Sequence, residues 1–200
     1  TVKIWNFAEN KLELNKVFNE DCYSVSFHPS GLHVLVGFSD KLRLMNLLME
    51  DINQFKEFPI KGCRECKFSN GGQYFAAVNG NTISLFNAYT CEVIAYLRGH
   101  NSKVRSICWT ADDSKIISAG MEGNIFEWSI PEGKHYTTAR NPGQTYQCLS
   151  TYGAGERVLA VGLEPLLQEF SKEQPTSGRK EDIKEYTPTK EIDCDTQLTQ

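Results

Sequence analysis

The 200-residue sequence lacks the features of a membrane-spanning or secreted protein. Its longest apolar runs, such as Val158–Val161, are far shorter than the roughly 20 residues that a membrane-spanning helix needs. The N-terminus has neither a hydrophobic signal-peptide core nor an initiator methionine, which predicts a piece of a longer chain. No Asn-x-Ser/Thr sequon is present. We therefore expect a cytoplasmic or cytoskeletal protein without membrane contact.

An excess of positive charge is also lacking. The chain has 21 Lys and Arg against 25 Asp and Glu, which gives a formal net charge of -4. Proteins that bind nucleic acid or anionic lipid usually carry a basic footprint. The charge therefore argues against a nucleic-acid or membrane partner.

The cysteines do not form a disulfide framework. Seven is an odd number, and without a secretory signal we expect reduced thiols in a cytosolic compartment. Cys63-Arg64-Glu65-Cys66 is the one close pair, and no second Cys or His pair accompanies it to complete a metal site. The segment is predicted to be a strand, where residues three apart face opposite sides. Two buried structural cysteines are the favoured interpretation, and a thiol oxidoreductase using Cys63 and Cys66 is the enzyme alternative.

Catalytic motifs are otherwise missing. None of the four histidines (28, 33, 100 and 135) accompanies a Ser or Cys in a nucleophile motif, and no Gly-rich phosphate loop occurs. We therefore expect no enzymatic activity, no cofactor and no metal.

What the sequence does contain is a repeat. An alternating segment ends in a large apolar residue followed by a small polar one, as in Ile4-Trp5-Asn6 and Leu85-Phe86-Asn87. The large residues stand at positions 5, 45, 86, 128 and 170, at intervals of 40 to 42 residues. Periods of this length indicate a repeat architecture.

Each period contains four expected strands. Cys63–Phe68 leads through a Gly-rich turn into Tyr74–Val78, and the signature strand and a more polar strand such as Val93–Leu97 follow. Leu47–Phe58 also has apolar residues at roughly helical spacing, but the flanking repeats favour a strand. Four short strands in about 40–45 residues are typical of a β-propeller blade.

The period sets the expected domain boundaries. The fold class is all-β, a WD40-type β-propeller present as an incomplete arc of about four blades. Residues 172–200 are polar, and we expect a flexible tail there, although Ile183–Tyr186 is a candidate outer strand. The predicted segments are the end of a preceding blade (1–20) and blades within 21–171, namely 21–62, 63–103, 104–144 and a partial blade 145–171.

One blade carries a specific motif. Gly99-His100 precedes the third full blade, and Ser118 and Trp128 follow. Here the chain resembles the WD40-repeat family, in which a His, a Ser or Thr, the Trp and a turn Asp form a structural hydrogen-bond chain. The resemblance implies that chain for His100, Ser118 and Trp128, with Glu122 at the expected Asp position. Such a chain satisfies buried polar groups and ties strands together.

A candidate binding surface follows from aligning the first strands. Tyr23, Arg64, Arg105 and Tyr146 recur every 41 residues. Equivalent positions of a propeller lie on one face, and Arg and Tyr are enriched at binding hot spots. We expect these four residues to contact a partner protein, and the alternative is that they are solvated or brace neighbouring blades.

Longer stretches, including Gly31–Asn46, Cys66–Gly72 and Phe75–Asn81, resemble the WD-repeat region of a family of large axonemal proteins of cilia and flagella. The resemblance implies propellers followed by a coiled-coil tail, a role in docking or assembling inner dynein arms in motile cilia, and axonemal or dynein-arm partners. This sequence has no coiled-coil heptads, and after about Ser171 it does not continue a recognisable blade. The predicted function is a non-enzymatic interaction scaffold of the ciliary axoneme. The alternative is a WD40 adaptor in another cytosolic complex, of the ubiquitin-ligase or trafficking type.

Overall fold

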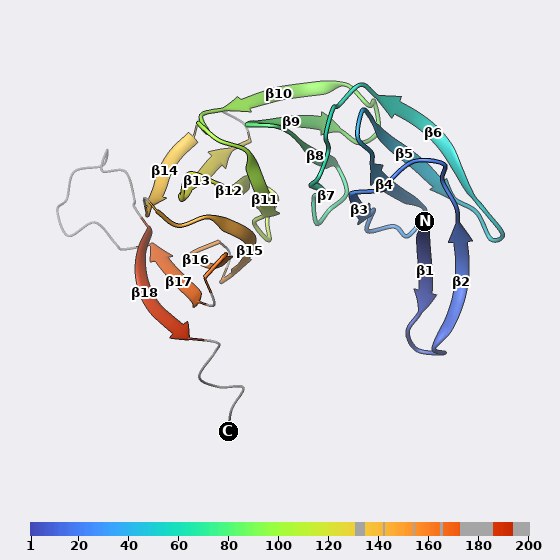
Figure 1. Ribbon diagram of the computed structural model, residues 1–200. Helices are drawn as coiled ribbons and strands as arrows, with labels where there is room; N and C mark the ends of the chain where they lie inside the picture. The colour runs from blue at the N-terminus through green and yellow to red at the C-terminus, as the bar shows by residue number, and fades with distance from the viewer. Residues whose placement is uncertain (131–134, 142, 154, 165, 173–185, 194–200) are drawn as a thin grey trace. The chain divides into compact units, whose positions relative to one another are not determined.

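The protein is all-β in the computed structural model (Figure 1), which describes residues 1–130, 135–141, 143–153, 155–164, 166–172 and 186–193. These residues form strands joined by turns and contain no helix. The chain divides into two compact units, Thr1–Gly80 with Ser84–Ile94 and Asn81–Ile83 with Ala95–Gln200.

Each sheet is antiparallel and is built from strands adjacent in sequence, as expected for blades joined by short turns. The N-terminal sheet pairs β1 (Val2–Asn6) with β2 (Lys11–Lys16). The next sheet has the order β3 (Ser24–Phe27), β4 (His33–Gly37), β5 (Leu42–Leu47), β6 (Ile52–Phe58). The third has the order β7 (Cys66–Phe68), β8 (Tyr74–Asn79), β9 (Thr82–Asn87), β10 (Val93–Arg98).

Two further four-stranded sheets follow. The first has the order β11 (Val104–Trp109), β12 (Lys115–Gly120), β13 (Asn124–Ser129), β14 (His135–Arg140). The last has the order β15 (Tyr146–Tyr152), β16 (Arg157–Gly162), β17 (Leu166–Lys172), β18 (Tyr186–Asp193). The blade count predicted from the 40-residue period is confirmed, with two outer strands before the first full blade.

Two local expectations are resolved. The helically spaced segment 47–58 forms the end of β5, a turn and β6, because the pairing of Leu47 with Ile52 closes a hairpin there.

The predicted tail needs correction, because residues 186–193 form β18, which pairs with β17 along its length. An outer strand needs only backbone hydrogen bonds on one side, so it tolerates Pro188 and a polar sequence. The last blade is therefore four-stranded, and the rest of 172–200 lies largely outside the described residues.

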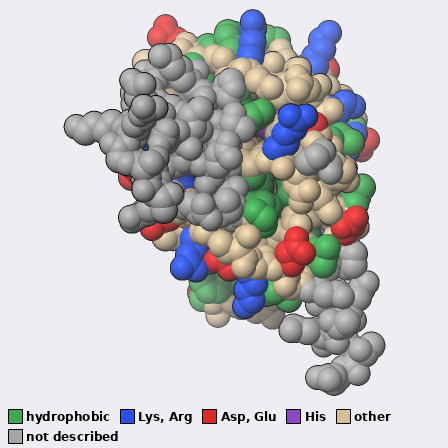
Figure 2. Space-filling view, turned by 90° about the vertical axis from the view of Figure 1, so that its left-hand side faces the viewer, with side chains coloured by type: hydrophobic (Ala, Val, Ile, Leu, Met, Phe, Trp, Pro, Cys, Tyr) green, Lys and Arg blue, Asp and Glu red, His purple; other side chains and the backbone are tan. Residues whose placement is uncertain are grey.

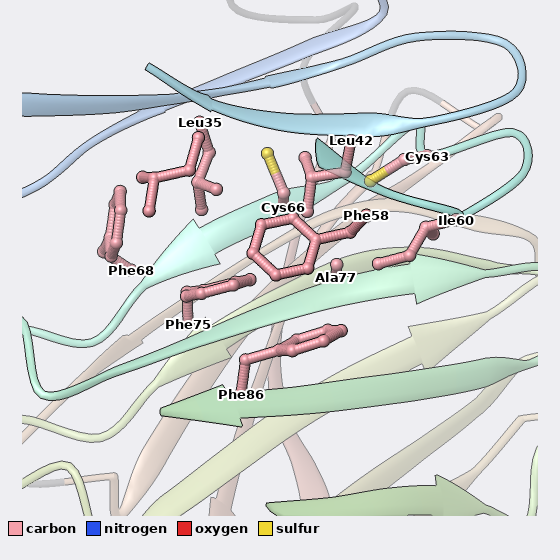
Figure 3. Close-up of a cluster of buried hydrophobic side chains, with 11 residues drawn as sticks. Leu35, Leu42, Phe58, Ile60, Cys63, Cys66, Phe68, Phe75, Ala77 and Phe86 are labelled. Carbon is pink, nitrogen blue, oxygen red and sulfur yellow. The ribbon is translucent and has the colours of Figure 1, made fainter. Parts of the chain in front are cut away.

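Apolar residues from adjacent sheets form the cores of the units. In the first unit a cluster of eleven buried side chains includes Phe58, Phe75 and Phe86 (Figure 3), with the rings of Phe75 and Phe86 stacked at 4.7 Å. In the second unit Ile117, Ile125 and other buried residues of the β11–β14 sheet pack with residues of the β15–β18 sheet. Sheet-on-sheet packing thus stabilises each unit.

The first inner strand is an exception to this burial. Val25 and Phe27 of β3 are 53% and 50% exposed. Cys66 and Phe68, at the same hairpin positions of β7, are 2% and 8% exposed. The β1–β2 sheet contains only two strands, so it provides no inner strands to cover β3.

Gly37 marks a close approach between consecutive blades. A Cβ built on Gly37 lies 2.3 Å from the backbone carbonyl oxygen of Cys63 and 2.3 Å from Ser24 Oγ. We expect Gly37→Ala to lower the free energy of unfolding by about 1–3 kcal/mol, as overpacking does in tight sites. Urea denaturation followed by circular dichroism measures the change. The double variant with Ser24→Ala is expected to remain destabilised, because the backbone carbonyl cannot be removed, and recovery of full stability would contradict this explanation.

Candidate functional site

A buried hydrogen-bond chain crosses the β11–β14 sheet. Trp128 Nε1 donates to Ser118 Oγ at 2.7 Å, and the same hydroxyl lies 2.7 Å from His100 Nε2. The other ring nitrogen, His100 Nδ1, lies 2.5 Å from the carboxylate of Glu122. The four residues come from the segment between β10 and β11, from β12, from the following turn and from β13. The hydrogen-bond chain therefore fixes two strands and two connecting segments through side chains alone.

Gly120 leaves space for the side chains of His100 and Glu122 in the hydrogen-bond chain. A Cβ built there lies 2.2 Å from the Glu122 carboxylate and 2.6 Å from His100 Nδ1. Glycine is therefore required for close packing around the imidazole. The carboxylate of Glu122, where the WD40 pattern has Asp, reaches the imidazole. These residues bind one another, which gives them a structural role.

The positions that correspond to Trp128 in the other four-stranded sheets hold apolar side chains. Met45, Phe86 and Phe170 are 2%, 5% and 1% exposed. They stabilise their blades by packing. The blade around Trp128 is the one in which this position carries a hydrogen-bond donor in a buried setting, since Trp5 is 56% exposed.

Two of the four predicted partner-binding residues come together in the first unit. The guanidinium of Arg64 lies over the ring of Tyr23, 5.0 Å from its centroid. Tyr23 is 41% exposed, and Arg64 is exposed as well. Stacking of a guanidinium on an aromatic face holds both side chains in place at the surface. The pair thus forms a rigid cationic and aromatic patch.

The other two residues lie in the second unit and differ from each other. Arg105 is half-buried, and its Nε is a buried donor with no hydrogen-bond partner. Tyr146 is 1% exposed, and its hydroxyl donates to Gln168 Oε1 at 3.0 Å. Burial also raises the pKa of the Tyr146 phenol. Tyr146 therefore belongs to the core and presents no surface to a partner.

Strand register explains this difference. Val104 pairs with Gly120 and Ser106 with Ala119, so Arg105 is the extra residue of a bulge. In the last sheet Tyr146 pairs with Gly162 and Cys148 with Val161, so Gln147 occupies the bulge. The residue equivalent to Arg105 is therefore Gln147, one position beyond the 41-residue spacing.

The Cys63-Arg64-Glu65-Cys66 motif lies in the core of the first unit. Cys63 is 0% and Cys66 is 2% exposed, as expected for structural thiols. The expected strand geometry needs correction, because β7 begins only at Cys66 and Cys63 follows a turn at Gly62 with φ of 62°. Both side chains consequently enter the same cluster instead of facing opposite sides.

Sequence reasoning did not anticipate a groove in the first unit. It has a volume of about 390 Å³ and is lined mostly by aromatic and apolar side chains. Among them are His28, His33, Phe55, Phe68 and Tyr89. His28 Nδ1 accepts from the Ser30 backbone N–H at 3.1 Å, so Nε2 carries the proton and donates to the carbonyl of Gly72 at 3.0 Å. The imidazole thus stabilises two turns, and the alternating sequence gave no signal that Phe55 of β6 would border a groove.

Other chemistries find no support in the described parts of the chain. They contain no group of three or more His, Cys, Asp or Glu that could hold a metal ion. The described residues also contain no helix that is long and apolar enough to cross a membrane. Acidic and basic side chains are interspersed on the coloured part of the face in Figure 2, without a field of one sign.

Comparison with known proteins agrees with this geometry. The sequence profile of the family described as WD domain, G-beta repeat matches residues 91–129, the region that contains His100, Ser118 and Trp128. With this match, the repeated four-stranded sheets and the buried hydrogen-bond chain, residues 91–129 carry the repeat of the WD40-repeat proteins.

Among these proteins the chain is similar to cilia- and flagella-associated protein 57. It is 48% identical to the Mus musculus protein over 171 residues, which are 86% of this chain and 14% of the relative. It is 43% identical to protein 57 A of Tetrahymena thermophila, over 66% of this chain and 10% of the relative. For protein 57 C of the same organism the identity is 38%, over 81% of this chain and 14% of the relative. The chain thus spans a small part of the length of these relatives.

Proposed function

We propose that this chain is a non-enzymatic interaction scaffold of the motile-cilium axoneme, with a role in docking or assembling inner dynein arms. The observation that carries the proposal is the 48% identity, over 86% of the chain, to a protein named for its association with cilia and flagella. The rigid blades support it, because buried side-chain networks and stacked cores hold surface residues in fixed positions.

We assign partner contact separately to two surfaces, that of Tyr23 and Arg64 in the first unit and that of Arg105 in the second unit. Tyr23 and Arg64 form the stacked pair of the first unit, and Arg105 holds its guanidinium Nε without a hydrogen-bond acceptor. Arg105 is only half-buried, and an arginine side chain that reaches the surface can donate to a carboxylate or a backbone carbonyl of another protein. Tyr146 is left out because it is buried.

The test is retention on axonemes. A tagged chain expressed in ciliated cells is followed by immunoblot in demembranated, salt-extracted axonemes and in cytosol. We expect the chain in the axonemal fraction, and we expect the Arg64→Ala/Arg105→Ala variant to bind about tenfold or more weakly, as for hot-spot residues.

Arg98→Ala/Arg140→Ala is the matched control, since both residues are exposed arginines at strand ends. Equal retention of the two double variants would refute the assigned surfaces. Detection of the unmodified chain in cytosol alone would refute the axonemal role and favour an adaptor in another cytosolic complex.

A further inference from the structure

Two cysteines in the core of the first unit lie beside the hydroxyl group of Ser24. Ser24 Oγ lies 3.4 Å from Cys66 Sγ, and it donates to the backbone carbonyl of Cys63 at 2.9 Å. The Cys63 thiol itself donates to the backbone carbonyl of Glu65 at 3.5 Å. Figure 3 shows both cysteines within the same buried cluster. Cys63 and Cys66 therefore lie in one buried cluster, on either side of the bonds that Ser24 makes.

The backbone explains how two residues only three apart both direct their side chains into one cluster. Gly62 adopts φ of 62°, and its N–H donates to the carbonyl of Ser39 at 2.6 Å, which fixes a turn before Cys63. Cys63–Glu65 is not part of a strand, and β7 begins at Cys66. The peptide therefore curves around the pair, as a short disulfide loop requires.

The two thiols differ in acidity. A hydrogen bond from Cys66 lowers the pKa of Cys63, against the effect of burial. The same bond and burial raise the pKa of Cys66. Cys63 is consequently the better nucleophile, and Cys66 is the thiol positioned to resolve its oxidation product.

We propose that Cys63 and Cys66 form an oxidative modification site, at which hydrogen peroxide converts the two thiols into an intramolecular disulfide. The Cys63 thiolate attacks one oxygen of the peroxide, the O–O bond breaks, and the hydroxide released takes a proton to become water. The Cys66 sulfur then attacks the sulfur of the Cys63 sulfenic acid and a second water leaves. Two thiols are oxidised and one peroxide is reduced to two waters.

Burial sets the expected order of reaction. Cys148 is exposed, whereas the two sites of the pair are closed to bulk solvent. We expect peroxide to oxidise Cys148 first, and the pair to follow as the first unit opens locally. Cys148 thus serves as an internal reference that the oxidant dose is sufficient.

The test is peptide mapping of the full chain after exposure to hydrogen peroxide, quenching and alkylation of the remaining thiols under denaturing conditions. Trypsin cleaves after Lys61, Arg64 and Lys67, so the two cysteines fall into peptides 62–64 and 65–67. We expect these peptides to be joined by a disulfide, lighter by about 2 Da than the sum of their thiol forms and separable by reduction.

Single variants distinguish the roles of the two thiols. In Cys66→Ser, Cys63 is expected to stop at the sulfenic acid and to be labelled by dimedone, whereas in Cys63→Ser the remaining Cys66 is expected to stay a thiol. Recovery of both wild-type cysteines in alkylated form after Cys148 is fully oxidised would overturn the proposal. Disulfides from the pair to other cysteines would overturn it as well. Mapping of the wild-type chain decides the question even where a variant does not fold.

Discussion

Replacing Trp128 by alanine is expected to lower the free energy of unfolding by about 3–5 kcal/mol, the range for deleting a large buried aromatic ring. The side chain is 1% exposed, it packs edge-to-face on Phe126 at 5.8 Å, and it donates to Ser118. The variant therefore loses packing and a buried hydrogen bond together. Urea denaturation followed by circular dichroism measures the effect, and hydrogen exchange of the β13 amides localises it.

Two variants separate the contributions. Trp128→Phe keeps most of the ring and removes the N–H donor, so we expect a loss of about 1 kcal/mol from the hydrogen bond, plus the packing of the missing ring atoms. Trp5→Ala, at the matching repeat position of the first sheet, is the control. Because Trp5 is 56% exposed, its loss is expected to stay within about 1 kcal/mol. Equal losses for Trp5→Ala and Trp128→Ala would show that burial does not determine the effect.

Glu127→Gln is expected to destabilise the second unit by about 3 kcal/mol, at the low end for breaking a buried ion pair. The Glu127 carboxylate is 4% exposed, accepts from Lys115 Nζ at 2.6 Å and forms a second ion pair with Lys172. Burial acts to raise the pKa of Glu127, but the hydrogen bonds from the two ammonium groups outweigh it, and the pKa is lowered. Burial lowers the pKa of Lys172, the bond to Glu127 opposes this effect, and the nearby charge of Lys115 lowers the pKa further.

The direction of the pKa shift determines how the stabilisation by Glu127 changes with pH. A carboxyl group with a lowered pKa in the folded state contributes stability above its ordinary pKa near 4.5 and loses it as the pH falls through the folded-state value. The difference in unfolding free energy between wild type and Glu127→Gln is therefore expected to be largest at neutral pH and to shrink in acid. Glu169→Gln, at the matching position of the last sheet, is the comparison: its carboxylate also has a lowered pKa but is more exposed, so we expect the same sign with a smaller loss. A difference that stays constant from neutral pH to below the ordinary pKa would contradict the assignment.

The sequence allowed the blades to be predicted because the large apolar residue of each third strand is needed in every core. Met45, Phe86, Trp128 and Phe170 are all buried, and their period is the period of the sheets. The bounds of β18 escaped prediction, although the sequence offers Ile183–Tyr186 as a candidate outer strand, because an outer strand forms through backbone hydrogen bonds and shows no apolar alternation.

The candidate site was predictable only in part. His100, Ser118 and Trp128 stand in a motif whose spacing is constrained by the sheet, and the structure joins them by hydrogen bonds. The position of Tyr146 was not predictable, because a bulge shifts the register by one residue without a signal in the sequence. Whether Tyr23 and Arg64 stack depends on side-chain packing between two strands, which a spacing of 41 residues does not contain.

Because β3 has an exposed apolar face, the stability of the first unit depends on whether other strands cover that face. Val25 and Phe27 leave half of their surface in water, and covering it is worth on the order of 1 kcal/mol for each side chain. A pair of strands that extends the β1–β2 sheet would gain this energy together with the backbone hydrogen bonds along β1. We therefore expect the melting temperature of this blade to be higher when such strands are bound than when it is alone. Its stability then depends on the assembly in which it takes part.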